Sequence, residues 1–192
     1  LTASAHNPLL DLQLGHGART YRTALELAEL ALRNASLERI EGETQSVSFV
    51  VDMNEAFEHF LSRSLKRVLR LPDGLWREKP TVHLDERHRY WMNPDMVWYS
   101  DTDRPSLVVD AKWKRTSEGV SADVKQVALY CTALGLRKGA LVYGEATKHS
   151  VHRIRNSATE VHVLSLDLEG PIDSVQERVA ILAQYLQSIR EH

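Results

Sequence analysis

The chain has 192 residues, of which 43% are hydrophobic and 26% are charged, and these proportions are typical of one globular domain. Its only cysteine, Cys131, excludes a disulfide framework, a cysteine-rich zinc site and a four-cysteine iron–sulfur cluster. The formal net charge of −2 disfavours a small autonomous DNA-binding module, which is usually far more basic. No apolar run approaches the ~20 residues needed to span a bilayer, and the N-terminal residues do not resemble a signal peptide. We therefore expect a cytoplasmic protein with no membrane segment.

The N-terminal part of the chain is expected to be a helical lead-in to a single domain. Residues 19–34 are typical of a helix, residues 35–46 are polar and turn-like, and residues 47–51 form a short apolar segment. No linker rich in proline, glycine or serine separates two domains. We assign residues 1–45 to the lead-in and residues 46–192 to the core of the same domain, including a C-terminal helix.

The clearest predicted helix follows residue 52. Asp52 is a candidate N-cap, and Glu55 stands three residues later, which is the spacing of a capping box. Glu58 borders the apolar stripe of this helix, where a carboxylate lowers stability unless it is paired or binds a cation. The stripe itself recurs at helical spacing, at Met53, Phe57, Leu61, Leu65, Val68 and Leu69.

The rest of the chain alternates strand and helix patterns, which predicts an α/β fold with a mixed central β-sheet flanked by α-helices on both faces. We expect one hairpin around the turn 85–88 and a second around the turn 101–105. The strands are predicted at 81–84, 89–92, 95–100, 106–112, 139–143 and 161–166. The helices are predicted at 121–134, ended by Gly135, and from Asp173 to Ile189, with Gln176 completing a capping box.

Acidic and basic residues coincide at the ends of two neighbouring predicted strands. Asp110 and Lys112 project to the same side of one strand, because strand side chains alternate between faces. If the strands joined by the 101–105 turn pair, the start of one lies beside the end of the other, and Asp95 then falls near Asp110 and Lys112. Glu58 could reach the same place from the preceding helix.

This combination of residue types is suited to phosphodiester hydrolysis. Two or three carboxylates provide the oxygen ligands that Mg²⁺ prefers. A bound cation lowers the pKa of a water molecule and polarises a phosphoryl oxygen. Lys112 is placed either to orient or deprotonate that water, or to stabilise charge in the transition state.

Other residues have weaker functional signals. The tryptophans Trp91, Trp98 and Trp113 are expected mainly in the core, with base stacking near DNA as the alternative. His149 and His152 have no accompanying metal-ligand motif, so no zinc site is expected there. Because there is no glycine-rich phosphate loop, any nucleotide hydrolysis is expected to come from a partner. The basic residues expected along a DNA path or at a partner surface are Arg63, Lys66, Arg67 and Arg70.

The Pro94-Asp95 pair followed by Asp110-Ala111-Lys112 resembles the motif of the PD-(D/E)xK nuclease superfamily, whose fold has a central mixed sheet flanked by helices. More narrowly, residues 19–143 resemble the McrC family, the nuclease subunit of McrBC modified-cytosine restriction systems. The Met-Asn-x-x-Phe-Glu block distinguishes McrC-like chains from the wider superfamily. The resemblance is found in four blocks that keep the order of the family, Asp52–Glu58, Asn93–Val97, Val109–Lys114 and Asp123–Tyr130.

The resemblance implies a role for each matching residue. Asp95 and Asp110 would be metal ligands, Lys112 the catalytic lysine, and Glu58 the helix acid that completes the site. The carbonyl of Ala111 would be a further ligand, and Gln126 would support the site from the following helix, whose face it shares with Asp123, Val127 and Tyr130. The cation would be Mg²⁺, for which Mn²⁺ can substitute. Lys114 continues the face of Asp110 and Lys112 and is expected to contact a DNA phosphate.

The implied function is a Mg²⁺-dependent DNA endonuclease, the cleavage subunit of a McrBC-type phage-defence system. Its partners would be DNA and a McrB-like GTPase, with the region that docks on the GTPase expected outside this chain, and a homodimer would serve double-strand cleavage. Two alternatives stay open. One is a stand-alone PD-(D/E)xK repair or transposition nuclease, and the other is an inactive DNA-binding or assembly module that keeps the fold.

Overall fold

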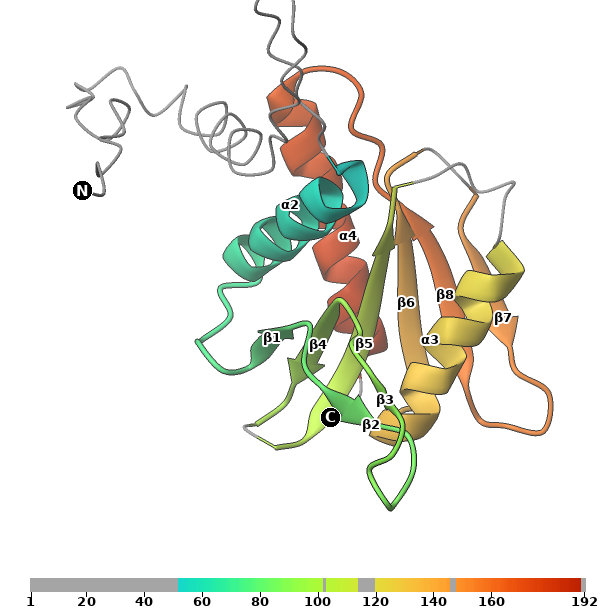
Figure 1. Ribbon diagram of the computed structural model, residues 1–192. Coiled ribbons are helices and arrows are strands. Elements are labelled where there is room, and N and C mark those ends of the chain that lie inside the picture. Colours follow the sequence, from blue (N-terminus) through green and yellow to red (C-terminus); the bar gives the residue numbers. More distant parts are fainter. Residues whose placement is uncertain (1–51, 102, 114–119, 146–147, 191–192) are drawn as a thin grey trace, which may run out of the picture. The chain divides into compact units, whose positions relative to one another are not determined.

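The computed structural model describes residues 52–101, 103–113, 120–145 and 148–190, and its part from Met53 onward forms one compact unit (Figure 1). The helix predicted at 19–34, the polar segment 35–46 and the apolar segment 47–51 lie outside the described residues. The assignment of 1–45 as a lead-in to the domain therefore stays a prediction. None of the helices in the described ranges combines the length and apolar character needed to cross a membrane.

The described residues form a mixed α/β structure with a six-stranded sheet, a separate two-stranded hairpin and three helices. The helices are α2 (Met53–Val68), α3 (Val120–Leu134) and α4 (Ile172–Ile189). The strands of the sheet are β1 (Trp76–Glu78), β4 (Met96–Tyr99), β5 (Pro105–Lys112), β6 (Lys138–Tyr143), β8 (Glu160–Ser165) and β7 (Ser150–Arg153). The hairpin consists of β2 (Val82–His83) and β3 (Trp91–Met92).

The sheet is mixed, as predicted. Its strand order is β1-β4-β5-β6-β8-β7. The pairs β5–β6 and β6–β8 are parallel, whereas β1–β4, β4–β5 and β7–β8 are antiparallel. The antiparallel pair β4–β5 is the second predicted hairpin, and its register sets Met96 opposite Val109 and Val97 opposite Val108.

Helices cover both faces of the sheet, which confirms the predicted layering (Figure 1). On one face, α2 and α4 pack over alternate residues of β4, β5 and β6, with Leu61, Val109 and Leu186 fully buried. On the other face, α3 packs against the remaining alternate residues, among them Val108 and Leu141. The close approach of α3 depends on Gly139 in β6, since a Cβ there would lie 2.6 Å from Cγ1 of Val127 and 2.7 Å from Sγ of Cys131.

Several element boundaries differ from the sequence-based expectations. Helix α4 begins at Ile172 after Pro171, and no side chain caps it, so the predicted capping box of Asp173 and Gln176 is wrong. Proline at this position supplies the extended backbone before the first turn, and Asp173 instead places its negative charge in the first turn.

Two strands were not predicted, and both are edge strands. Strand β1 has three residues, too few for a period-two pattern, and only Trp76 in it is buried. Strand β7 is polar and largely exposed, with a sequence that also suits a loop. Each forms because a neighbouring strand offers an unpaired edge, β4 to β1 and β8 to β7.

Candidate functional site

The ends of β4 and β5 bring Asp95 and Asp110 together, as the strand pairing predicted. Asp95 stands immediately before β4, and the pairing of Met96 with Val109 sets it beside Asp110. The backbone N–H of Ala111 donates a hydrogen bond to Oδ2 of Asp95 at 2.8 Å. This bond holds the Asp95 carboxylate against the end of β5.

Asp110 is the most deeply buried acid of the site. Its side chain is fully inaccessible to solvent, because α3 covers this face of β5. Nζ of Lys112 lies 2.7 Å from Oδ2 of Asp110, so the two side chains form an ion pair. Among the described residues, Oδ1 of Asp110 has no hydrogen-bond partner, and Lys112 provides the contact to Oδ2. A buried carboxylate oxygen without a partner lowers stability, and a bound cation or a hydrogen-bond donor would offset this cost.

The pKa values of both Asp95 and Asp110 are raised. Burial is the main cause that raises the pKa of Asp110 to about 7, and the nearby charge of Asp95 adds to it, while Lys112 opposes it. Burial also raises the pKa of Asp95, partly offset by the hydrogen bond from Ala111. Burial on its own would lower the pKa of Lys112, but the carboxylates of Asp110, Asp95 and Asp123 together outweigh it and raise that pKa above the ordinary value. Lys112 is therefore a cation at neutral pH.

Glu58 reaches the site from α2 but is already paired. Its Oε2 lies 2.9 Å from Nζ of Lys79, which follows β1. The hydrogen bond with Glu58 is the main reason that the pKa of Lys79 is raised. Glu58, Lys79 and Asp95 line a shallow pocket of about 230 Å³ together with His59, Ser62 and Glu78. Glu58 thus lies near Asp95, as expected, although it forms an ion pair with Lys79.

Two of the three acids are each paired with a lysine. Lys112 contacts Asp110 and Lys79 contacts Glu58. Within the described ranges, no three His, Cys, Asp or Glu side chains are grouped closely enough to hold a metal ion as they stand. A cation shared by Asp95, Asp110 and Glu58 would therefore need the Glu58–Lys79 pair to open. Asp95 and Asp110 are the stronger ligand candidates, because Lys112 contacts only Oδ2 of Asp110 and its Oδ1 has no hydrogen-bond partner among the described residues.

A second polar layer behind the site comes from α3 and β6. The hydroxyl of Tyr143 donates a hydrogen bond of 2.6 Å to Oδ2 of Asp123, which is buried in α3. Nε2 of Gln126 donates to the hydroxyl of Tyr130 at 2.6 Å. Burial raises the pKa of Tyr130 to about 12, and the charge of Asp110 contributes to this shift. Gln126 thus connects to the site through Tyr130.

Sequence reasoning did not assign Asp123, Tyr143 or Lys79 to the site. The shared helical face of Asp123, Gln126 and Tyr130 was a usable signal for the first of them. Tyr143 and Lys79 carried no signal, because β6 and the end of β1 reach the site only through the sheet topology.

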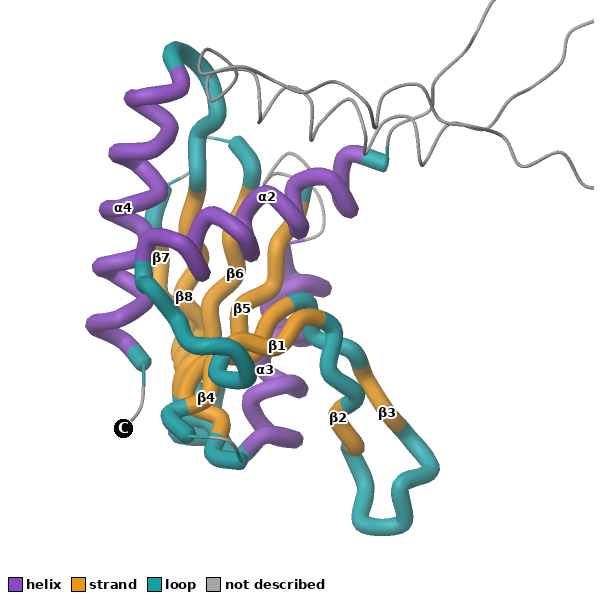
Figure 2. The backbone as a smooth tube through the Cα atoms, turned by 90° about the vertical axis from the view of Figure 1, so that its left-hand side faces the viewer, coloured by secondary structure: helices purple, strands orange, loops and turns teal. Residues whose placement is uncertain are grey.

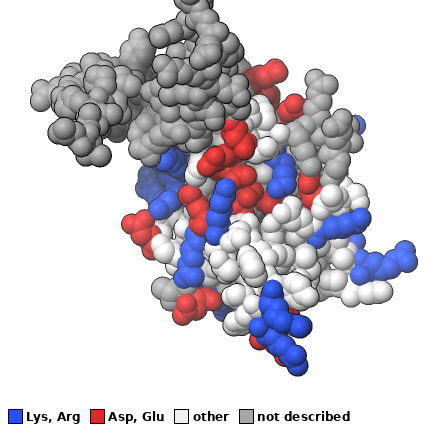
Figure 3. Space-filling view, viewed as in Figure 1, with Lys and Arg blue, Asp and Glu red and all other residues white. Residues whose placement is uncertain are grey.

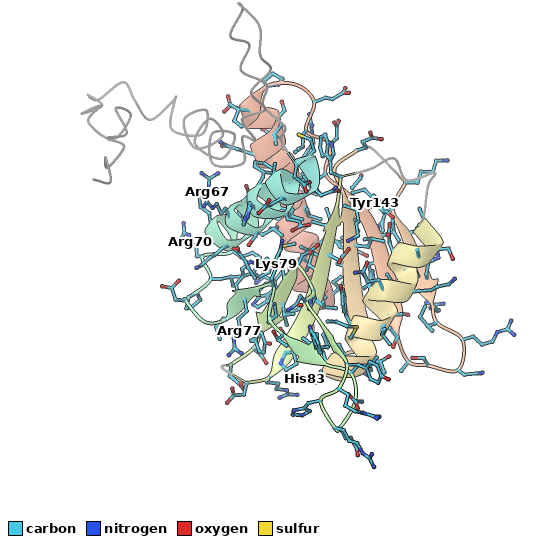
Figure 4. All side chains as sticks on the ribbon, in the orientation of Figure 1. Arg67, Arg70, Arg77, Lys79, His83 and Tyr143 are labelled. Carbon is cyan, nitrogen blue, oxygen red and sulfur yellow. The ribbon has the colours of Figure 1, made fainter. Side chains whose placement is uncertain are left out.

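The predicted DNA-binding residues lie on the C-terminal half of α2 and beyond it. Arg63, Arg67 and Arg70 are exposed, and Figure 4 shows Arg67 and Arg70 at the outer end of this helix. Lys66 is paired with Asp73, with Nζ 2.8 Å from Oδ1. On the face shown in Figure 3, acidic side chains gather near the centre, with basic side chains on both sides of them. Lys114 lies outside the described residues.

The tryptophans differ in their environments. Trp98 is buried against Trp76, and Trp113 is half-buried against Phe57, so core packing is confirmed for these two. Trp91 is 64% exposed, and the expectation that it packs in the core is wrong. The reason is that β3 belongs to the separate hairpin and pairs only with β2.

One comparison with known proteins identifies a family. The family model described as "McrBC 5-methylcytosine restriction system component" matches residues 2–144, well over half of the chain. The matched range contains every residue assigned to the site above. A search of curated proteins found no match.

Proposed function

Because the chain belongs to the family of McrBC 5-methylcytosine restriction system components, we propose that it is the DNA-cleaving subunit of such a system. The proposed activity is Mg²⁺-dependent hydrolysis of DNA phosphodiester bonds, with Mn²⁺ able to substitute. The mixed sheet flanked by helices, with an acid before β4 and Asp-x-Lys at the end of β5, supports a PD-(D/E)xK endonuclease fold.

The single observation that carries this proposal is the state of Asp110. Its carboxylate is fully buried, its Oδ1 has no hydrogen-bond partner among the described residues, and it lies near a second carboxylate and is paired with Lys112 through Oδ2. A purely structural role would favour a neutral side chain of the same shape, because burial of like charges lowers stability. The arrangement fits a divalent cation held by Asp95 and Asp110, with the carbonyl of Ala111 and, after release from Lys79, Glu58 as further ligands.

In this proposal, the cation and the residues of the chain have separate roles in the reaction. When bound, Mg²⁺ supplies an acidified water and polarises the scissile phosphate. Lys112 remains protonated, because its pKa is raised, and a fixed ammonium stabilises the negative charge that grows on the phosphate oxygens. This favours the stabilising role of Lys112 over deprotonation of the water. Gln126 supports the site from α3 through its hydrogen bond to Tyr130.

A component of the McrBC system acts with a partner of that system. We propose that this partner is a McrB-like GTPase that delivers DNA to Asp95, Asp110 and Lys112. The basic residues at the end of α2 and Lys114 would contact DNA or the partner, and a homodimer would allow both strands to be cut. The slightly acidic net charge agrees with weak DNA affinity of the isolated chain.

The test is nicking of plasmid DNA with Mg²⁺, with Mn²⁺ and with EDTA, by the wild type and by Lys112→Ala, each with and without the GTPase partner. We expect metal-dependent cleavage that the partner increases and Lys112→Ala abolishes. Cleavage that survives in EDTA or in the variant would contradict the proposal. Rapid, modification-specific cleavage without the partner would favour a stand-alone nuclease, and no cleavage under any condition would favour an inactive assembly module.

A further inference from the structure

The β2–β3 hairpin (residues 80–94) begins and ends at the candidate site. It follows Lys79, which pairs with Glu58, and it precedes Asp95. The backbone N–H of Lys79 donates to the carbonyl of Asp95 at 2.9 Å, which closes the base of the hairpin. Figure 2 shows its two strands projecting beyond the sheet. An element that projects from the rim of a site is well placed to contact what enters it.

One face of the hairpin anchors it to the domain. Val82 is buried, and Met92, its partner across the hairpin, packs against the apolar cluster under α3. Nδ2 of Asn93 lies 3.4 Å from the carbonyl of Lys79 and 3.3 Å from Oγ1 of Thr81, so it links the returning strand to the outgoing one.

The tip is also preorganised. Oδ1 of Asp85 accepts hydrogen bonds from the backbone N–H groups of Arg89, at 2.7 Å, and Tyr90, at 3.0 Å. His88 adopts a positive φ of 55°, which lets the turn close. The hairpin is thus held in shape at both of its ends.

The opposite face carries aromatic rings that are exposed to solvent. His83 and Trp91 are paired across the two strands and therefore share this face. The ring of His83 stacks on that of His88 at a centroid distance of 4.1 Å and an interplanar angle of 11°. Trp91 is 64% exposed, and Figure 4 shows His83 on the part of the hairpin remote from Arg67 and Arg70. Exposed, rigid aromatic rings of this kind stack on nucleobases.

The charge of the hairpin argues for a base rather than a phosphate as the ligand. Arg87 and Arg89 are matched by Asp85 and Glu86, and Arg89 already pairs with Asp85 at 3.2 Å. Trp91 lies four residues before Asp95, so its backbone is at most about 14 Å from that of Asp95. A DNA strand whose phosphate lies at Asp95 and Asp110 has a neighbouring base within reach of Trp91.

Resting on the proposed function, we propose that the hairpin holds DNA near the cleavage point by stacking Trp91 on an unpaired base. The substrate class is therefore DNA with an unpaired nucleotide near the scissile phosphate, as a single strand or a locally opened duplex. Because the contact is a stack, it adds affinity without adding to the salt dependence of binding.

The test is equilibrium binding of the whole chain in EDTA to a labelled single-stranded oligonucleotide and to its duplex, over a range of salt concentrations. We expect Trp91→Ala to weaken binding to the single strand by about five- to 100-fold, with an unchanged salt slope and a smaller effect on the duplex. Trp91→Phe should restore most of the loss. Ile181→Ala, which truncates a similarly exposed residue on α4, is the matched control and should have no effect.

Unchanged binding by Trp91→Ala would overturn the hairpin assignment, as would a loss that is equal for strand and duplex. Loss of binding to the GTPase partner with DNA binding intact would also overturn it, in favour of a protein contact. These results are separate from cleavage. Asp110→Asn should bind DNA in EDTA without cutting it in Mg²⁺, whereas a wild type that binds through Trp91 but never cleaves would overturn the proposed function alone.

Discussion

Helices cover both faces of the central sheet, but the residues that β5 presents to the two faces differ in polarity. The face covered by α2 and α4 is apolar where it contacts β5, through Leu107, Val109 and Ala111. The face covered by α3 begins with Val108 and continues into Asp110 and Lys112. Strand β5 therefore contributes buried apolar side chains on one face and the acid and the lysine of the candidate site on the other. The comparison shows that burial, which stabilises the first face, is what perturbs the acids on the second.

The largest effect is expected on the polar face. Lys112→Ala should lower the rate of DNA cleavage in Mg²⁺ by about 10²–10⁴-fold, because it removes the fixed positive charge that we propose to lie beside the scissile phosphate. The measurement is the single-turnover rate of plasmid nicking. Lys125→Ala, an exposed lysine of α3, is the control. A similar fall in both variants would mean that general DNA affinity, and not a catalytic role, explains the loss.

On the apolar face, the expected change is in stability and not in chemistry. Leu61 is fully buried between α2 and the sheet, so Leu61→Ala should lower the free energy of unfolding by about 2–5 kcal/mol. Urea unfolding measures this, with Ile181→Ala as the exposed control. The cleavage rate per folded molecule should be unchanged. A large fall in that rate would show that the two faces are more strongly coupled than their residues indicate.

The buried acid on the polar face should make the free energy of unfolding depend on pH. Burial raises the pKa of Asp110 from 3.8 to about 7, so the folded state favours the protonated carboxyl. This contribution to stability is fully present below about pH 4 and is lost as the pH rises to 7. Asp110→Asn cannot ionise, and its stability relative to the wild type should rise by up to about 4 kcal/mol across this window. Unfolding free energies measured at several pH values test this. A constant difference would contradict the raised pKa.

The same variant tests the metal. In the proposed site, Mn²⁺ or Mg²⁺ would bind the ionised acids, so it should raise the melting temperature of the wild type increasingly as the pH approaches and passes 7. Asp110→Asn should lose this shift while remaining folded. An unchanged shift would place the metal elsewhere.

A smaller effect is expected behind the site. Tyr143→Phe removes the hydroxyl that donates to Asp123, and the loss of a buried hydrogen bond to a carboxylate should lower stability by about 1–3 kcal/mol. Tyr90→Phe, on the exposed part of the hairpin, is the matched control and should change little. Equal stability of the two variants would indicate that Asp123 does not depend on Tyr143.

The smallest effect concerns DNA contacts outside the site. Lys114→Ala should weaken DNA binding uniformly across sequences and reduce its salt slope by about one charge, because the residue is expected to contact a phosphate. Cleavage at saturating DNA should be retained, in contrast to Lys112→Ala. If the two lysine variants behave alike, the division between contact and catalysis is wrong.

The sequence by itself determined the elements whose patterns are long or carry specific residue types. Helix α2 was predicted because its apolar stripe repeats over several turns, and the β4–β5 pairing followed from two apolar strands around a polar turn. The proximity of Asp95 and Asp110 then followed from this pairing, which sets the start of one strand beside the end of the other. Local periodicity is sufficient to predict such features, because they depend on residues that are close together along the chain.

Only the tertiary structure decided the features that depend on distant segments. The edge strands β1 and β7 form because β4 and β8 offer partners, and Trp91 is exposed because β3 stands outside the sheet. The pairing of Glu58 with Lys79, and of Asp123 with Tyr143, joins residues 21 and 20 positions apart along the chain. Such contacts leave no periodic signal in the sequence, since they depend on which elements become neighbours in space. The raised pKa of Asp110 has the same origin, because it results from the burial that α3 provides when it packs on β5 and β6.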